Sequence, residues 1–334
     1  MSKSSFEIGV SLKPLFGYWE RGLDLKYRKY RLKWLLASKK HKVYDFPIHI
    51  DIETTNNCNL RCVMCGINFA KETFGSITWE LFQKIIDEGV QHGLCSIKLN
   101  WRGEPLLHPR VVDMVRYAKE KGIVEVQFNT NGQLLTEEKA RGLIEAGLDR
   151  IIFSVDGATK ETYEKIRRGG IYERLVNNIE TLLRLKKEMK KKLPLTRIQF
   201  VEMKENMHES ELFKKTWEGK IDEVIVNPFL DMSYLDPNAN EVDRSSGNLK
   251  LQERKPCNQI WQRLIISYDG KVMMCCDDWN MGCILGDVTH QSIHSIWHGE
   301  KLSNIRRMHL AGKLNEIPVC KNCPSLDSYV YEKK

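Results

Sequence analysis

Three cysteines stand close together in the first quarter of the chain: Cys58, Cys62 and Cys65 form the pattern CxxxCxxC. Thiolates at this spacing can converge on one inorganic centre without any long-range contact. A structural zinc ion normally takes four protein ligands, whereas a [4Fe–4S] cluster held by three leaves one iron open to another molecule. The spacing alone therefore allows two interpretations, an open iron–sulfur cluster or a zinc loop with a distant fourth ligand.

Four more cysteines near the end of the chain could saturate a second centre. They are separated by 17, 44 and 2 residues, and they are Cys257, Cys275, Cys320 and Cys323. Four thiolates suit a cluster or a structural zinc ion equally well. Cys276 and Cys283 flank one of these ligands, so each could be a packing residue, an alternative ligand or a hydrogen-atom donor. Cys95, at the start of a predicted strand, is expected to be a buried and inert thiol.

The composition is that of a globular protein in a reducing compartment. Of 334 residues, 42% are apolar and 29% are charged, which suits about two domains. No apolar run approaches the roughly 18 residues of a membrane span, and the start of the chain lacks the pattern of a secretory signal. We therefore expect a cytoplasmic protein without a membrane span, whose ten cysteines serve metal ligation rather than disulfides.

The net charge of +8 is concentrated in one segment. Residues 21–42 contain nine Lys or Arg and one acid, so the rest of the chain is balanced, which argues against a nucleic-acid surface on the folded body. On a helix, Tyr27, Tyr30 and Trp34 would lie on one side with leucines roughly opposite, unlike the single apolar face of a membrane-surface helix. We expect a helix docked on the body or between the body and a partner, with an anionic partner for its charge as the less favoured alternative.

The elements that must position the cysteines alternate between strand and helix from residue 49 onward, which is typical of a parallel sheet built from βα units. The strands are predicted at 49–54, 96–100, 124–130, 150–155, 196–202 and 223–227, and the helices at 78–90, 109–121, 136–146, 171–192 and 208–217. After Pro228 a polar linker precedes a smaller region that holds six cysteines. We expect a basic extension at 1–46, a βα domain at 47–235 and a small α+β domain at 236–334.

Unusual polar sequence follows the first four predicted strands. The CxxxCxxC segment follows the first, Trp-Arg-Gly-Glu-Pro (101–105) the second, Asn-Thr-Asn-Gly (129–132) the third and Ser-Val-Asp-Gly (154–157) the fourth. Because the carboxyl ends of parallel strands meet at one edge of a sheet, these segments are expected to form one site.

Together, these ordered motifs resemble the radical S-adenosylmethionine (SAM) superfamily over residues 47–227. The resemblance implies a partial (β/α)6 TIM-like barrel, a [4Fe–4S] cluster on the three loop cysteines, and SAM bound to the open iron. It assigns Gly103 and Glu104 to the motif that receives the SAM ammonium, with Arg102 in place of the family's first glycine. Ser154 and Arg167 match positions that bind the SAM carboxylate or ribose. Arg168 follows Arg167 directly and could take its role. Met64 stands where an aromatic residue often lies beside the adenine.

The carboxyl-terminal region resembles the twitch module, a shortened SPASM domain. The resemblance rests on the order of the four cysteines, the Asp269-Gly270 turn and the Ser-Ile-Trp helix (295–297) before the last CxxC. It implies one auxiliary [4Fe–4S] cluster on Cys257, Cys275, Cys320 and Cys323, because no cysteine follows Cys323 in the sequence. Such a cluster could accept the electron of a substrate radical.

The expected function is that of a radical SAM oxidoreductase acting on a small polar molecule, with an external electron donor of the flavodoxin or ferredoxin type. The cysteine spacing resembles that of the aminocyclitol dehydrogenases, which oxidise an alcohol to a ketone. Two alternatives within the family are an epimerase that uses Cys276 or Cys283 as hydrogen donor, and a maturase of a ribosomal peptide, against which the lack of a recognisable leader-binding domain in the first 45 residues counts. From a different class, a non-catalytic zinc-binding interaction protein stays open.

Overall fold

The computed structural model describes residues 24–69, 73–229, 249–321, 323 and 329–333. The predicted boundary between the second and third domains, at residues 235–236, lies outside this part of the chain. Among the described residues, no helix is long and apolar enough to cross a membrane.

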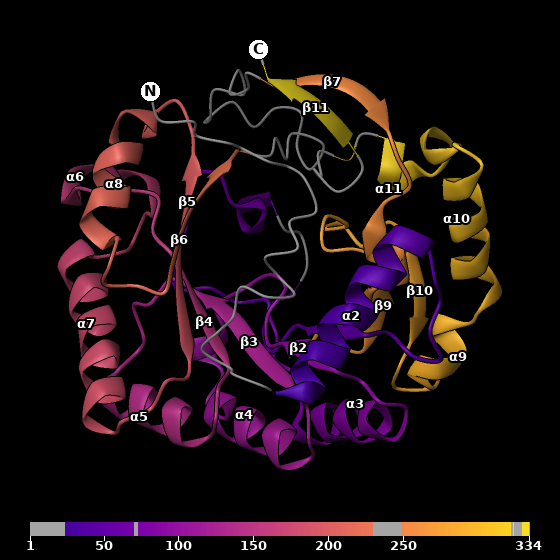
Figure 1. Ribbon diagram of the computed structural model, residues 1–334, viewed down its shortest axis with the longest axis horizontal. Helices are drawn as coiled ribbons and strands as arrows, with labels where there is room; N and C mark the ends of the chain where they lie inside the picture. The colour runs from indigo at the N-terminus through magenta and orange to yellow at the C-terminus, as the bar shows by residue number, and fades with distance from the viewer. Residues whose placement is uncertain (1–23, 70–72, 230–248, 322, 324–328, 334) are drawn as a thin grey trace.

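Six parallel strands form the curved centre of the molecule, and six helices lie on its outer side (Figure 1). Their bounds are β1 His49–Ile52, α3 Trp79–Gln91, β2 Ser96–Lys98, α4 Val111–Glu120, β3 Glu125–Thr130, α5 Glu137–Glu145, β4 Arg150–Ser154, α6 Lys160–Ile166, α7 Tyr172–Glu188, β5 Leu195–Glu202, α8 Ser210–Trp217 and β6 Glu223–Pro228. Adjacent strands pair in chain order from β1 to β6. The predicted partial (β/α)6 barrel is therefore confirmed, with α6 as a helix that the sequence did not predict.

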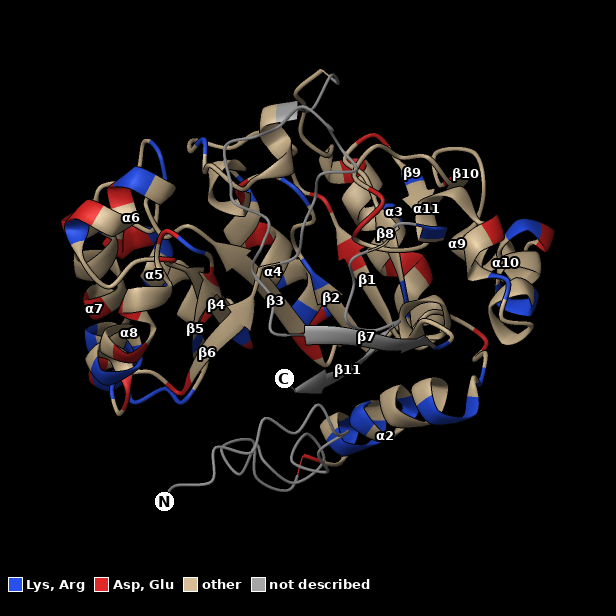
Figure 2. Ribbon diagram, turned by 90° about the horizontal axis from the view of Figure 1, so that it is seen from above, with Lys and Arg blue, Asp and Glu red and all other residues tan. Residues whose placement is uncertain are grey.

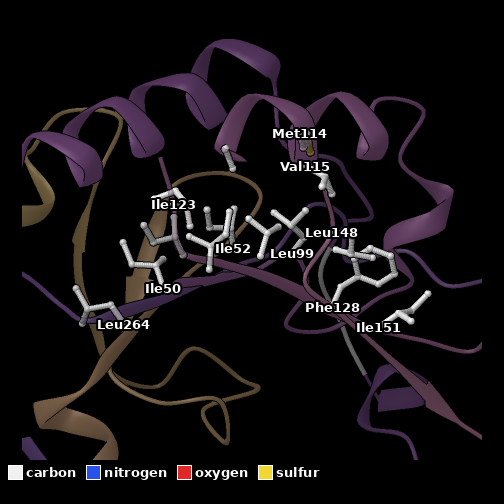
Figure 3. Close-up of a cluster of buried hydrophobic side chains, with 14 of the residues drawn as sticks. Ile50, Ile52, Leu99, Met114, Val115, Ile123, Phe128, Leu148, Ile151 and Leu264 are labelled. Atoms are coloured by element: carbon white, nitrogen blue, oxygen red, sulfur yellow. The ribbon is translucent and has the colours of Figure 1, made fainter. Parts of the chain in front are cut away.

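Apolar residues on one side of each strand pack under the helices. Figure 3 shows Ile50 and Ile52 of β1, Leu99 after β2 and Phe128 of β3 in this layer, facing Val115 of α4. All five side chains are at most 1% exposed. The alternation of strand side chains then turns the intervening residues toward the concave inner face.

The inner face is polar. Asp51 of β1 is fully buried and contacts three cations or imidazoles: His49 Nε2 at 2.9 Å, Lys98 Nζ at 3.4 Å and Arg263 Nη1 at 3.3 Å. These groups hold the pKa of Asp51 well below its usual range, against the effect of burial. Farther around the sheet, Gln127 and several other inner residues are only half-buried. The barrel interior is therefore polar and partly open.

The carboxyl-terminal region continues the barrel sheet. Strand β8 (Arg263–Ile266) pairs in parallel with β1, and β9 (Lys271–Met273) and β10 (Ile284–Asp287) follow antiparallel, giving the order β10-β9-β8-β1-β2-β3-β4-β5-β6. The remaining elements are η5 Asn258–Trp261, α9 Ile293–Trp297, α10 Glu300–Leu310, α11 Pro318–Lys321 and a separate ladder of β7 Leu249–Arg254 with β11 Tyr329–Lys333. Both cysteine-rich regions thus belong to segments joined by one sheet.

Helix α2 (Leu25–Lys40) lies across the amino-terminal ends of the central strands (Figure 2). The side chain of Asp24 caps it by accepting hydrogen bonds from two backbone amides at 3.0 and 3.1 Å. Tyr30 is buried, and the ring of Trp34 meets that of His49 edge-on at 5.9 Å. Leu25 and Leu32 are 67% and 48% exposed. The helix is therefore docked through its aromatic side, as expected, whereas these two leucines contribute little to the docking.

Candidate functional site

The first cysteine of the three-cysteine loop stands six residues after β1 ends, and the loop is fixed by the end of α6 and the chain that follows it. The backbone amides of Arg61 and Val63 donate to the carbonyl oxygens of Arg168 and Ile166 at 2.9 and 3.0 Å. Cys62 is buried, whereas Cys58 and Cys65 are half-buried free thiols. The loop thus holds its thiols partly accessible at the carboxyl end of the sheet.

Hydrogen-bond donors point at the loop sulfurs. The amide of Leu60 donates to Cys58 Sγ at 3.4 Å, and the side-chain amide of Asn131 donates to the same sulfur at 3.8 Å. Burial raises the pKa of Cys58 to about 11 and that of Cys65 to about 12, and the neighbouring thiols add to both shifts. The three thiols are therefore close enough to repel one another as thiolates, and a cationic centre would relieve that repulsion. This donor set fits a cluster held by three cysteines.

The Gly103-Glu104 motif packs directly against the cysteine loop. Gly103 has a φ of +60°, and a Cβ on it would lie 2.2 Å from the carbonyl oxygen of Thr55. Only glycine fits here without moving the loop. The amide of Glu104 donates to the carbonyl oxygen of Asn57 at 2.8 Å. The two motifs are thus one structural unit, as their order in the sequence suggested.

The carboxylate of Glu104 joins the segment after β2 to the end of β3. It accepts hydrogen bonds from the Thr130 hydroxyl at 2.7 Å, the Asn131 amide at 2.8 Å and the Leu106 amide at 3.1 Å. Burial raises its pKa, although these donors act in the opposite direction. Since Asn131 of the Asn-Thr-Asn-Gly segment also reaches Cys58, Glu104 is connected to the cysteine loop through this segment.

Arg102, which departs from the family pattern, has its own partners. Its guanidinium donates to both carboxylate oxygens of the fully buried Glu53 at 2.7 and 3.1 Å, and to the carbonyl oxygen of Trp279 at 3.2 Å. It also lies over the ring of Trp101, 4.2 Å from the centroid. Arg102 therefore ties the ends of β1 and β2 to the carboxyl-terminal region, which explains why an arginine replaces a glycine.

Arg167 reaches the loop from the end of α6. Its guanidinium donates to Cys62 Sγ at 3.5 Å and pairs with the buried carboxylate of Asp156. Burial opposes its charge, but Asp156 and Cys62 outweigh burial and raise its pKa above the usual value. Arg168, the neighbour, contacts the loop through its backbone. Ser154 ends β4 and Met64 lies inside the cysteine loop, both half-buried.

The four later cysteines come together around one cavity. Its lining includes Cys257, Cys275, Cys320 and Cys323, with Asp277, His309 and apolar side chains between them. Burial raises the pKa of Cys275 strongly, and nearby Cys276, Asp277, Cys257 and Cys323 add to the shift. Four converging thiols in a mostly enclosed cavity fit a fully ligated metal centre.

His309 is a further component of this cavity, and nothing in the sequence pointed to it. Its Nδ1 accepts a hydrogen bond from the backbone amide of Cys257 at 3.2 Å, and its Nε2 lies 3.5 Å from Cys320 Sγ. The ring is 1% exposed. It therefore connects two of the four cysteines directly.

The two cysteines with undecided roles lie in different surroundings. Cys283 is buried in the hydrophobic core, and its amide donates to Asp278 at 2.9 Å. Cys276 is half-buried, and its sulfur accepts a hydrogen bond from Arg263 Nη2 at 3.1 Å. Arg263 also contacts Asp51, so the Cys276 thiol belongs to the polar inner face. Burial raises its pKa to about 11, which Arg263 partly offsets.

Comparison with known proteins agrees with this geometry. A family model described as the radical SAM superfamily matches residues 52–197. Residues 52–197 form a radical SAM domain. A second model, of the SPASM iron-sulfur cluster-binding domain, matches residues 257–324. The radical SAM protein thus binds a [4Fe–4S] cluster and SAM, with further iron–sulfur chemistry in its SPASM-like domain, and the zinc-binding interaction protein is no longer favoured.

Relatives of this radical SAM protein have diverse activities. A tungsten-containing aldehyde ferredoxin oxidoreductase cofactor-modifying protein of Pyrococcus furiosus is 26% identical over 85% of this chain and 89% of its own. A GTP 3',8-cyclase of Limosilactobacillus fermentum is 38% identical, over 44% of each chain. The chain therefore spans less than half of that cyclase.

Solved structures share the fold. BtrN in complex with AdoMet and 2-DOIA has a TM-score of 0.57 and 18% identity, covering 88% of this chain and 98% of its own. Streptococcus suis SuiB bound to S-adenosylmethionine has a TM-score of 0.65 and 15% identity, covering 92% and 81%. These matches confirm the partial barrel with its carboxyl-terminal extension.

Proposed function

We propose that the protein is a radical SAM dehydrogenase that oxidises a hydroxyl group of a small polar molecule, such as a sugar or an aminocyclitol. When bound, the first cluster and SAM supply a 5′-deoxyadenosyl radical that removes a hydrogen atom from a carbon of the substrate. Loss of a proton and one electron from the resulting radical gives the ketone. The observation that supports this proposal is the four-cysteine cavity. Four cysteines would fully ligate a [4Fe–4S] cluster and leave no iron free for substrate, which suits a role in electron transfer.

In this proposal the residues around the cysteine loop hold SAM. The backbone at Gly103 and the carboxylate of Glu104 receive its ammonium group, and Arg167 and Ser154 bind its carboxylate or ribose. Met64 packs beside the adenine. Support comes from the contacts of the Gly103-Glu104 motif and of Arg167 with the loop, which gather these residues at the carboxyl end of the sheet.

The polar inner face of the barrel favours a polar substrate over an apolar one. Lys98, Gln127, Gln199 and Asn227 are half-buried there, so donors and acceptors remain available for a hydroxylated molecule. A radical SAM enzyme also needs an external reductant, and we assign that role to a flavodoxin or ferredoxin type of protein.

An epimerase is the second candidate, because the Cys276 thiol belongs to the inner face. A hydrogen-atom donor must carry an S–H bond, which a cysteine thiol supplies. Cys283, packed in the core, does not suit this role.

The two functions differ in the mass of the product. With a substrate deuterated at the reacting carbon, both transfer deuterium to 5′-deoxyadenosine. In H2O, a dehydrogenase gives a product that has lost one deuterium and one hydrogen, whereas an epimerase gives an isomer in which the deuterium is replaced by a solvent hydrogen. Cys276→Ala should leave dehydrogenation intact and abolish epimerisation, with Cys283→Ala as the matched control. Deuterium transfer from a peptide but from no sugar or cyclitol would replace both candidates with a peptide maturase.

A further inference from the structure

The exposed side of α2 is strongly basic and ends beside the four-cysteine cavity. Lys39 and Lys40 close the helix, Lys42 follows it, and all three side chains are exposed. We call these three residues the α2 basic end. Figure 2 shows basic residues distributed along this helix, and its aromatic side is docked on the barrel. Lysines at the carboxyl end of a helix also interact favourably with the helix dipole. The dipole does not explain the ring contacts of His41.

Between Lys40 and Lys42, His41 connects the surface with the interior. It has the left-handed conformation, with a φ of 48°, at the end of α2. Its half-buried ring lies 4.5 Å, centroid to centroid, from that of Trp261, which is 1% exposed. The ring of Trp261 meets that of His309 edge-on at 6.3 Å. Three aromatic rings therefore run without a gap from the basic surface to the cavity.

The last contact of this series is a hydrogen bond to a cluster ligand. The backbone amide of Cys257 can only donate, so Nδ1 of His309 must be its unprotonated acceptor. The hydrogen of a neutral His309 is then on Nε2, which lies 3.5 Å from Cys320 Sγ. His309 therefore donates to a sulfur that is positioned to bind the auxiliary cluster.

We propose that the α2 basic end docks a small acidic electron-transfer protein, a flavodoxin or ferredoxin by chemical class, and that His41, Trp261 and His309 connect it electronically with the four-cysteine site. This inference rests on the proposed function, because each dehydrogenation leaves one electron at the auxiliary cluster. The oxidised carrier takes up that electron, becomes reduced by one electron and dissociates, and no atoms are exchanged. Opposite charge would speed the encounter and orient the carrier. A nucleic acid would also be attracted by the lysines, but its binding would not explain the series of aromatic rings.

Binding to the holoenzyme tests the docking surface. We would titrate oxidised flavodoxin into protein that holds both clusters and follow its flavin fluorescence at low and at 0.5 M salt. The variant Lys39→Glu/Lys40→Glu/Lys42→Glu should raise Kd by about tenfold or more and remove most of its salt dependence. The control, Lys190→Glu/Lys191→Glu/Lys192→Glu, reverses three exposed lysines after α7 and should change Kd less than twofold. Equal effects of both variants, or tighter binding of a short DNA duplex than of flavodoxin, would overturn the proposal.

Electron transfer tests the rings separately from binding. After reduction of the auxiliary cluster, its reoxidation by saturating flavodoxin can be followed by stopped-flow absorbance. His41→Leu should slow this step severalfold at an unchanged Kd, whereas His290→Leu, at an exposed histidine outside the ring series, should not. Trp261→Phe keeps an aromatic ring in the core and serves as a milder second variant. If reoxidation is unchanged in both ring variants, the route is wrong. Continued ketone formation with a small chemical oxidant would show that the dehydrogenase proposal survives that failure.

Discussion

The cysteine loop after β1 and the four-cysteine cavity differ in how many elements build them and in how open they are. The loop places three thiols within eight residues, two of them half-buried, next to the Gly103-Glu104 motif. The cavity collects four thiols from segments up to 66 residues apart, with His309 between two of them. The loop site is therefore specified locally and the four-cysteine site by tertiary packing, which suits the proposed roles of a centre that binds SAM and a centre that exchanges electrons.

Removing the loop thiols should have the largest effect, because it should abolish both the loop cluster and SAM cleavage. The variant Cys58→Ala/Cys62→Ala/Cys65→Ala should lose about half of the iron, since one of two four-iron clusters is gone, together with all SAM cleavage. Iron analysis, electron paramagnetic resonance (EPR) spectra with and without SAM, and 5′-deoxyadenosine assays measure this. Cys95→Ala is the control, because it removes a buried thiol that belongs to neither set of cysteines. A SAM-dependent change in the EPR signal of the triple variant would contradict the assignment of the open cluster to the loop.

The reciprocal variant separates cleavage from oxidation. Cys257→Ala/Cys320→Ala should also lose about half of the iron, yet it should still cleave SAM and form 5′-deoxyadenosine. Ketone formation should stop, because the substrate radical has no electron acceptor. Ketone produced at the normal rate by this variant would show that the cavity has no electronic role.

The buried pair between Glu53 and Arg102 connects the two regions, and breaking it should cost stability. Arg102→Met leaves the Glu53 carboxylate buried without its cation, so the free energy of unfolding should fall by about 3–5 kcal/mol. Glu53→Gln/Arg102→Met removes both charges and should recover most of that loss. Anaerobic denaturant titrations measure both values. Equal stability of the single and the double variant would mean that the Arg102 contacts with Trp101 and Trp279, rather than the charge pair, hold the two regions together.

Much of the fold and of the loop site could be predicted because the signals are local. Short β-branched or apolar runs between helical patterns indicated all six barrel strands, and the CxxxCxxC and Gly103-Glu104 motifs lie shortly after β1 and β2. Helix α6 was missed because its seven residues are too few to show a helical period. The pairing of β8 with β1 could not be predicted from the sequence either, since more than 200 residues separate the two strands.

Long-range partners explain the other differences. Nothing near Arg102 indicates that Glu53, 49 residues away, receives its guanidinium. His309 stands eleven residues before Cys320, outside any metal-binding spacing, and reaches the cavity only through the packing of α10. His294 and His298 reach the side chain and the carbonyl oxygen of Asp45, and no motif in the sequence links residues so far apart.

The hydrogen bond from His309 to Cys320 should have the smallest effect, and it would sharpen the comparison further. Donation of a hydrogen bond to a cluster sulfur stabilises the more negative reduced state, so its loss in His309→Leu should lower the auxiliary midpoint potential. One net hydrogen bond of about 0.5–1.5 kcal/mol corresponds to roughly 20–65 mV for one electron. EPR-monitored redox titration measures this shift, His309→Gln should restore part of it by supplying an amide donor, and the potential of the loop cluster should stay unchanged. A shift of both clusters together would mean that His309 supports the fold as a whole and not the auxiliary site alone.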